Sequence, residues 1–279
     1  MSGAIPAASQ ARDWSALTKA LDNDHVTRLH LALALFMFAN FLLFLPAWLL
    51  DPRMLDSASV WTKPQKFNLS LSLHFLTLAV LFQMVPREIR NGPSLLLFSY
   101  LAAGSLLLEY VWVGWQAAQA KRSHFNYDTP FEAIMYGLMG VGAFFLVAVA
   151  LALAVQIWRK GERSGRGLWL GAILGLSLSF AVAVVFGFQM SSSGRYVGAP
   201  LEGGGATIPF FGWSREYGDL RPSHFVGLHM MQTLPLIGWV ADRLSWRPVL
   251  TVTIAAAAQT ALTAALFYQA MNGQPFWPV

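Results

Sequence analysis

Seven long apolar segments constrain the fold of this chain more than any other feature. Each holds about 19 or more mostly apolar residues, the length that an α-helix needs to cross a hydrocarbon layer of roughly 30 Å. Backbone groups inside lipid must pair within the segment, and the runs are too long for barrel strands. The sequence therefore predicts an all-α polytopic membrane protein with seven transmembrane helices. These helices are expected near 29–50, 67–86, 94–115, 131–157, 167–190, 223–241 and 248–270.

The composition is typical of a membrane-embedded chain. Only 12% of the 279 residues are charged, against about 25% in an average soluble domain. The chain has no cysteine, which excludes disulfides, Fe–S clusters and thiolate metal sites. The net charge of +5 indicates basic loops on one side of a bilayer rather than binding to nucleic acid. The expected partners are the lipid bilayer and a lipophilic or anionic small molecule, and no oligomeric state is predicted.

The distribution of lysine and arginine predicts the topology. The densest basic cluster, RKGERSGR at 159–166, follows the fourth apolar segment. Cytoplasmic loops carry an excess of these residues, so the N-terminus is expected in the cytoplasm and the C-terminus in the periplasm of a bacterial inner membrane. Residues 1–28 then form a cytoplasmic segment and 29–270 form the seven-helix domain. A long outer loop is expected at 191–221, and a periplasmic tail at 271–279.

Three polar stretches are expected at the outer face, because the alternating topology places them there. They are WTKPQKFNLSLSLHF, LEYVWVGWQAAQAKRSHFNYDTPFE and GWSREYGDLRPSHFVGLHMMQTLP. With a rise of about 1.5 Å per residue, His74 lies roughly 12 Å inside its segment, and Glu109 and His229 lie roughly 9 Å inside theirs. An ionisable residue inside a membrane is a functional-site hypothesis by default. The sequence predicts one outward-facing polar pocket, provided that the second, third and sixth segments are neighbours.

The candidate site residues follow from their side-chain chemistry. The candidate catalytic carboxyl groups are Glu109 and Asp219, and the candidate ligands for Zn or Fe are His74, His124, His224 and His229. The candidate substrate-binding residues are Lys63, Lys66, Arg122, Asn126, Arg221 and Gln232. Structural alternatives stand beside these roles. Asp219 is also placed to pair with Arg221 or Arg215, and Glu132 to cap the fourth helix within the box TPFE. His224 and His229 lie about 140° apart on a regular helix and do not share a face.

At WTKPQKF, KRSHFNYDTPFEAIMYGLMG and GWSREYGDLRPSHFVGLHMMQTLP the chain resembles an uncharacterised group of bacterial inner-membrane proteins. The resemblance covers most of the spans and implies no activity. It implies recurring motifs that contain Lys63, Lys66, His124, Asn126, Asp219, Arg221, His224 and His229. The stretch SLSLH at 70–74 is also similar to the S-x-x-x-H of the alkaline ceramidase and progestin-receptor-like superfamily. Its members bind zinc through one histidine on helix 2 and an H-x-x-x-H on helix 7, whereas the seventh segment here contains no histidine.

Four functions fit this pattern. A metal-dependent membrane enzyme would hold Zn or Fe through Glu109 and the histidines of the outer stretches, and would activate water against a lipid or another lipophilic substrate. A b-type haem protein of electron transfer would use His74 and His229 as its axial pair. A transporter or proton relay would use Glu109, His229 and Tyr136, although the cytoplasmic halves of the helices carry few polar groups. A non-catalytic scaffold would use the polar motifs only to organise its loops.

Overall fold

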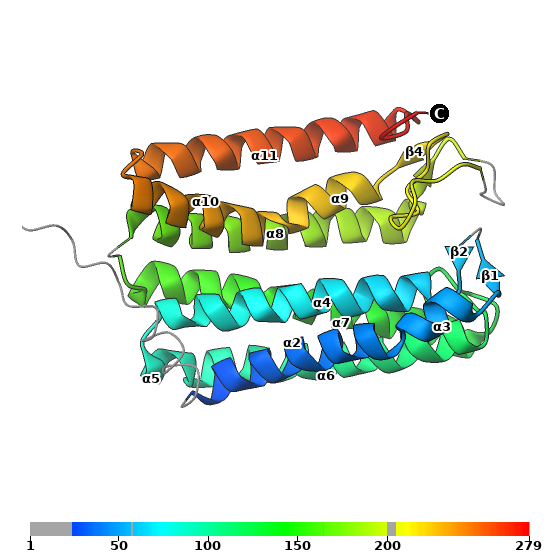
Figure 1. Ribbon diagram of the computed structural model, residues 1–279, viewed down its shortest axis with the longest axis horizontal. Coiled ribbons are helices and arrows are strands. Elements are labelled where there is room, and N and C mark those ends of the chain that lie inside the picture. Colours follow the sequence, from blue (N-terminus) through cyan, green and yellow to red (C-terminus); the bar gives the residue numbers. More distant parts are fainter. Residues whose placement is uncertain (1–23, 57, 164, 200–204, 279) are drawn as a thin grey trace, which may run out of the picture.

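Long helices that run side by side make up most of the computed structural model (Figure 1), which describes residues 24–56, 58–163, 165–199 and 205–278. Most of the predicted cytoplasmic segment 1–28 lies outside the described residues. In chain order the elements are α2 (His25–Leu43), α3 (Leu45–Leu50), β1 (Met54–Leu55), β2 (Ala58–Ser59), α4 (Thr62–Leu81), η1 (Phe82–Met84), α5 (Arg87–Arg90), α6 (Pro93–Ala118), α7 (Pro130–Lys160), α8 (Arg166–Ser193), β3 (Tyr196–Val197), β4 (Gly218–Asp219), α9 (Arg221–Leu228), α10 (Met230–Leu244) and α11 (Pro248–Met271).

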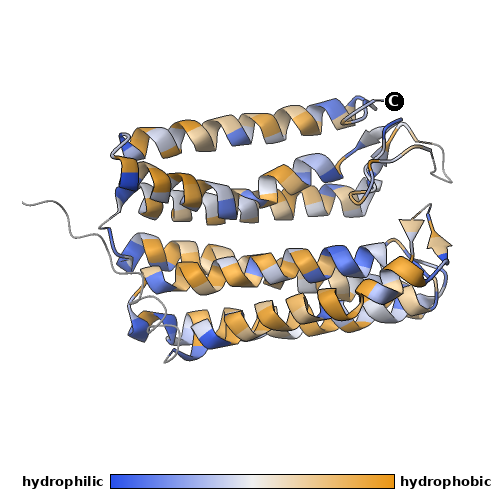
Figure 2. Ribbon diagram, viewed as in Figure 1, coloured by the Kyte–Doolittle hydropathy of each residue, from blue (hydrophilic) through white to orange (hydrophobic). Residues whose placement is uncertain are grey.

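Among the described residues, six helical stretches are long and apolar enough to cross a membrane. They are His25–Leu50, Thr62–Met84, Pro93–Ala118, Pro130–Lys160, Arg166–Ser193 and Pro248–Met271. Figure 2 shows apolar residues along the middle of the helices and polar residues gathered at both ends of the bundle. Large apolar side chains such as Phe188, which is 76% exposed, point away from the protein. Such a surface is suited to lipid rather than water, so the prediction of an all-α polytopic membrane protein is confirmed.

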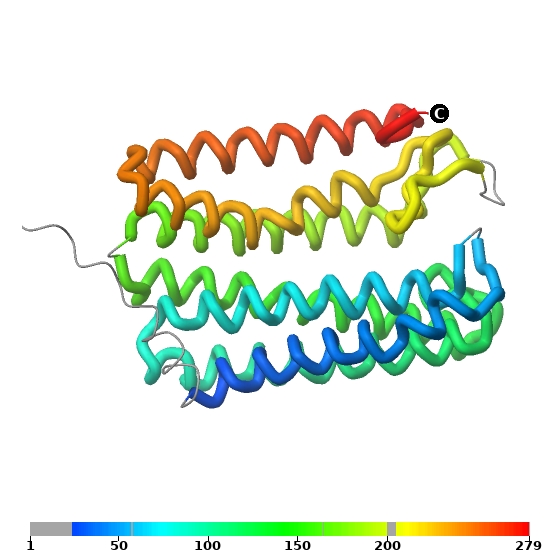
Figure 3. The backbone as a smooth tube through the Cα atoms, in the orientation of Figure 1, coloured from blue at the N-terminus to red at the C-terminus, as the bar shows by residue number. Residues whose placement is uncertain are grey.

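The predicted helix at 223–241 is not continuous. The structure divides it at His229 into α9, with 8 residues, and α10, with 15 residues. Figure 3 shows the chain bending between these two helices. Pro235 lies inside α10, where its ring crowds the carbonyl one turn earlier and removes a backbone donor. Just before the break, the Val226 carbonyl accepts a hydrogen bond of 2.9 Å from the Gln259 side chain of α11, which satisfies a backbone group at the irregular turn.

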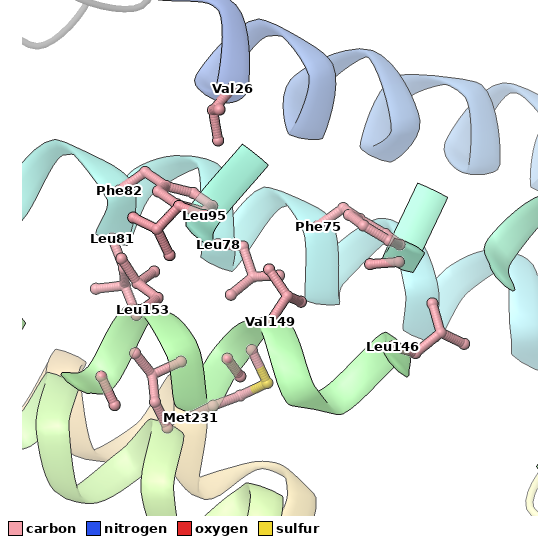
Figure 4. Packing of buried hydrophobic residues seen from close by; sticks show 14 of the residues in the cluster. Val26, Phe75, Leu78, Leu81, Phe82, Leu95, Leu146, Val149, Leu153 and Met231 are labelled. Atoms are coloured by element: carbon pink, nitrogen blue, oxygen red, sulfur yellow. The ribbon is translucent and has the colours of Figure 1, made fainter. Parts of the chain in front are cut away.

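Two groups of helices form the bundle. One contains α2, α3, α4, α6 and α7, the other contains α8, α9, α10 and α11, and α7 packs against α8 between them (Figure 1). The main core joins both groups, because Phe75 and Leu78 of α4, Val149 and Leu153 of α7, and Met231 of α10 belong to one buried cluster (Figure 4). The discontinuous α9–α10 segment is therefore part of the same packed core as the predicted second helix.

Glycines let α8 and α10 approach each other closely. A Cβ atom on Gly171 would lie 2.3 Å from the Leu234 carbonyl oxygen, and one on Gly175 would lie 2.5 Å from the Met230 oxygen. Real side chains do not fit at such distances, so the two backbones are in direct contact. Small residues spaced four apart are typical of tightly packed membrane helices. The start of α10, directly after the break at His229, is thus held against α8.

Both pairs of short antiparallel strands lie at one end of the bundle, which we call the strand end (Figure 1). Strands β1 and β2 pair antiparallel, with Met54 opposite Ser59, and β3 pairs antiparallel with β4, with Tyr196 opposite Asp219. The second pair closes the predicted outer loop 191–221. Helices α4, α7 and α9 begin at this end and α6 ends there, so the three predicted polar stretches do share one face of the bundle.

Candidate functional site

A buried carboxyl group and an imidazole meet at the strand end. Glu109 is carried by α6 and is 1% exposed, and His124 lies in the loop that joins α6 to α7. The Nε2 atom of His124 lies 3.9 Å from Oε2 of Glu109. This oxygen has no hydrogen-bond partner among the described residues. Burial, and then the charge of Lys63, lower the pKa of His124 well below its ordinary value. The imidazole is therefore neutral at pH 7, and its contact with Glu109 is not an ion pair.

Aromatic rings and loop hydrogen bonds fix the position of His124. Its ring centroid lies 5.9 Å from that of Phe67 on α4 and 5.9 Å from that of Tyr136 on α7. Trp112 of α6 donates its indole hydrogen to the Ser123 carbonyl at 3.0 Å. The loop residue before the histidine is thus tied to the helix that carries Glu109. Three helices, α4, α6 and α7, surround the imidazole.

The predicted substrate-binding residue Asn126 is engaged within the same loop. Its amide donates to the Arg122 carbonyl at 3.0 Å and accepts from the Asp128 backbone at 3.0 Å. The loop then enters α7 through the predicted cap, since Thr129 accepts a bond of 3.2 Å from the Glu132 backbone. These contacts shape the turn that presents His124 and do not leave the Asn126 amide free.

Two lysines lie on the first turns of α4. The helix begins at Thr62 rather than near residue 67 as predicted, so Lys63 and Lys66 are helical and lie on one face, three residues apart. Lys66 donates to the Phe211 carbonyl at 3.1 Å. The Lys63 ammonium lies 5.9 Å from the centre of the Phe67 ring. It donates no hydrogen bond to a described residue and forms no ion pair with one. The charged groups that act on Lys63 electrostatically are Arg195, Glu109, Lys66 and Arg221.

Asp219 and Arg221 form a buried pair. The guanidinium donates to both carboxylate oxygens, the shortest contact being 2.6 Å, and it also donates to the Gly212 carbonyl at 2.6 Å. The carboxylate further accepts a bond of 2.9 Å from the Ser214 backbone. The Asp219 side chain is 0% exposed. The structural alternative from the sequence thus accounts for both oxygens of Asp219, and the structure offers no support for its candidate catalytic role.

Asp56 was not predicted as a site residue. It lies beside the β1–β2 turn with a positive φ of 51°, and its carboxylate accepts from Arg122 at 2.6 Å and from Arg195 at 3.4 Å. Burial acts to raise the pKa of Asp56, but the bond from Arg122 and the charges of both arginines outweigh it and lower the pKa. The predicted substrate-binding Arg122 is therefore already paired. Only the tertiary fold reveals this contact, because 66 residues separate Arg122 from Asp56.

The predicted metal ligands are not assembled into one centre. Within the described ranges, no three histidine, aspartate or glutamate side chains form a group that could hold a metal ion. His74 bonds the Leu146 carbonyl at 2.9 Å, and His229 bonds Gln232 at 3.2 Å. Nδ1 of His224 is buried and has no partner in the described part of the chain. Of the candidate haem pair, His74 thus bonds to α7 and His229 bonds to α10. Gln232, which was predicted to contact the substrate, donates a hydrogen bond to Thr77 of α4.

Six charged or titratable residues interact with one another at the strand end, and we call them the strand-end cluster: Lys63, Lys66, Glu109, His124, Arg195 and Arg221. Its arginines each pair with a carboxylate, Arg195 with Asp56, which Arg122 shares, and Arg221 with Asp219, whereas neither lysine forms an ion pair with a carboxylate of the described chain. The cluster lies where the apolar helices end, and together with the fold it marks a polytopic membrane protein with a polar site at one surface. No protein-family model, curated protein or solved structure matches the chain.

Proposed function

We propose that the chain crosses a bacterial inner membrane seven times, with α9 and α10 together as one crossing. The two helices lie against α8 and α11, and the stretch 221–244 spans roughly 36 Å at about 1.5 Å per residue. The basic residues Arg159, Lys160, Arg163 and Arg166 lie at the end opposite the strands. By the excess of basic residues in cytoplasmic loops, the N-terminus is cytoplasmic and the strand end faces the periplasm.

We propose that the strand-end cluster binds the anionic head group of a lipid-like molecule. The observation that carries this proposal is the lack of a carboxylate ion-pair partner for Lys63, whose electrostatic neighbours are mostly cations. A half-buried ammonium among like charges is unfavourable unless an anion compensates it. Asp56 and Asp219 hold the nearby arginines in fixed positions. A negative ligand would therefore enter a preformed cationic site beside the apolar surface of the bundle.

A second candidate function is acid–base catalysis on the bound molecule. It is favoured by the distance of 3.9 Å between His124 and Glu109 and by the unpartnered Glu109 oxygen. A neutral imidazole accepts a proton, and a carboxyl group beside it orients or exchanges one. This chemistry requires no metal, and the arrangement of the histidines gives Zn, Fe or haem b no support.

The proposal is tested by measuring head-group preference. The purified protein in phosphatidylcholine nanodiscs would be titrated with fluorescent phosphatidylglycerol and with fluorescent phosphatidylcholine of the same chains. We expect saturable binding that is several-fold tighter for phosphatidylglycerol. Inorganic phosphate serves as competitor: displacement would identify a free anion as the ligand, and no displacement would identify an amphiphile. Equal binding of both lipids, with no effect of phosphate, would contradict the proposal.

A further inference from the structure

A groove runs between α6 and α7 below the strand-end cluster. It has a volume of about 280 Å³ and is lined by Tyr100, Leu101, Gly104, Ser105, Leu108, Leu138, Val141, Gly142 and Phe145. Most of these side chains are apolar, and the floor contains three very small residues where bulky ones would fill the space. At about 1.5 Å per residue, Leu138 lies roughly 12 Å and Tyr100 roughly 27 Å from the strand-end termini of their helices. The groove is therefore at the depth of lipid chains.

The floor of this groove adjoins Glu109 of the strand-end cluster. A Cβ atom on Gly142 would lie 3.8 Å from Oε1 of Glu109 and 3.6 Å from Cβ of Ser105. The buried carboxyl group thus lies directly behind the glycine and the serine of the floor. The apolar groove and the strand-end cluster therefore adjoin each other at Glu109.

We infer that the α6–α7 groove holds the hydrocarbon chain of the amphiphile whose anionic head group binds the strand-end cluster. The inference rests on the proposed function and adds the ligand class: an anionic lipid with a long chain. An apolar groove favours a hydrocarbon chain, and the lysines of the strand-end cluster favour a negative head group. Glu109 adjoins both regions, because its Oε1 atom lies behind Gly142 of the groove floor and its Oε2 atom lies 3.9 Å from Nε2 of His124.

Substitution of Gly104 by leucine tests the groove without disturbing the fold. A Cβ atom at Gly104 meets nothing within 4 Å, and the same holds for Gly140, which is also exposed but does not line the groove. Gly104→Leu would fill the groove, and Gly140→Leu is the matched control. The probes are phosphatidylglycerol and phosphatidylcholine with a photoactivatable diazirine near the end of one chain, each incorporated into vesicles with the protein. Mass spectrometry then locates the labelled residues.

We expect the phosphatidylglycerol probe to label the groove in the natural protein and in Gly140→Leu, and to label it at least threefold less in Gly104→Leu. Unchanged labelling in Gly104→Leu would overturn the inference. Equal labelling by both probes would also overturn it. If both probes label the groove equally and Gly104→Leu still loses the label, the groove holds a chain but the cluster does not select the head group. This outcome would contradict the proposed function. Label that stays head-group-selective but lies outside the groove would leave the proposed function intact and refute only the chain site.

Discussion

Oε2 of Glu109 lies 3.9 Å from Nε2 of His124, although one residue is inside a membrane helix and the other is in a loop. Glu109 is 1% exposed, and its Oε2 atom has no hydrogen-bond partner among the described residues. A buried polar atom without a partner destabilises a folded protein. Sites that bind or react often retain such groups, because their function requires them. This unpartnered oxygen is consistent with the ligand site that we propose at the strand end.

Replacement of Glu109 by methionine is expected to stabilise the protein. It removes a buried carboxyl group with an unpartnered oxygen and keeps a similar volume, so the free energy of unfolding should rise by about 1–3 kcal/mol. Thermal unfolding in detergent measures the change. Glu132 provides the control, because it is also buried but pairs with Lys121 at 3.4 Å and bonds Thr129. Glu132→Met should lower stability, and a similar loss in Glu109→Met would show that its carboxyl group is structurally satisfied.

The close approach of α8 to α10 predicts a strong effect of a single methyl group. Gly171→Ala places a Cβ atom 2.3 Å from the Leu234 oxygen, so the helices must separate, at a cost of about 1–3 kcal/mol. We expect a clear drop in the unfolding temperature. Gly187→Ala on the same helix meets nothing within 4 Å and should leave that temperature unchanged or slightly raised. Equal unfolding temperatures for the two variants would refute the glycine contact.

A buried aspartate at the opposite end predicts a pH dependence of stability. Asp24 caps α2 and interacts with Thr27, Asn91 and Arg90. Burial acts to raise the pKa of Asp24, but these hydrogen bonds and the charge of Arg90 outweigh it and lower the pKa. The carboxylate therefore stabilises the folded protein at pH values above its ordinary pKa, and this contribution is lost as the pH falls from about 4 toward the lowered value.

The variant Asp24→Asn tests that dependence. At pH 6 it should unfold at a lower temperature than the natural protein, by an amount equivalent to about 1–3 kcal/mol. As the pH falls below about 4, the difference should shrink, because the folded protein progressively loses the charge of Asp24 as well. Asp128→Asn changes an exposed carboxylate in the loop before α7 and should have little effect at either pH. A difference that stays constant from pH 6 to pH 3 would contradict the charged role of Asp24.

The sequence predicted the helical class because apolar length is a local property. Four of the expected segments match single helices within a few residues at both ends, and the cap of Thr129 on α7 was visible as a short motif. The start of α4 was placed too late, because Thr62 to Lys66 read as a polar loop. Lysines at a helix end keep their charged heads near the surface, so the helix continues through them.

The break at His229 and the partners of the charged residues could not be predicted in the same way. Pro235 and Gly227 permit an irregular helix, but the break also depends on contacts with α8 and with Gln259 of α11. The Asp56–Arg122 pair joins two loops that no local pattern connects. The contact between Glu109 and His124 brings together two residues that the sequence named as candidates. The partners of His74 and His229, the Leu146 carbonyl and Gln232, could not be predicted, because depth along a helix says nothing about which side a residue faces.

The central claim is that Lys63 binds an anionic head group at the strand end. The most direct measurement is the ratio of phosphatidylglycerol to phosphatidylcholine affinity in nanodiscs for Lys63→Gln. Lys160→Gln, which removes the same charge at the opposite end of α7, is the control. Loss of one cation near the head group is worth about 1 kcal/mol, so the ratio should fall about fivefold in Lys63→Gln and stay unchanged in Lys160→Gln. An unchanged ratio in Lys63→Gln, or an equal fall in both variants, would contradict the proposed site.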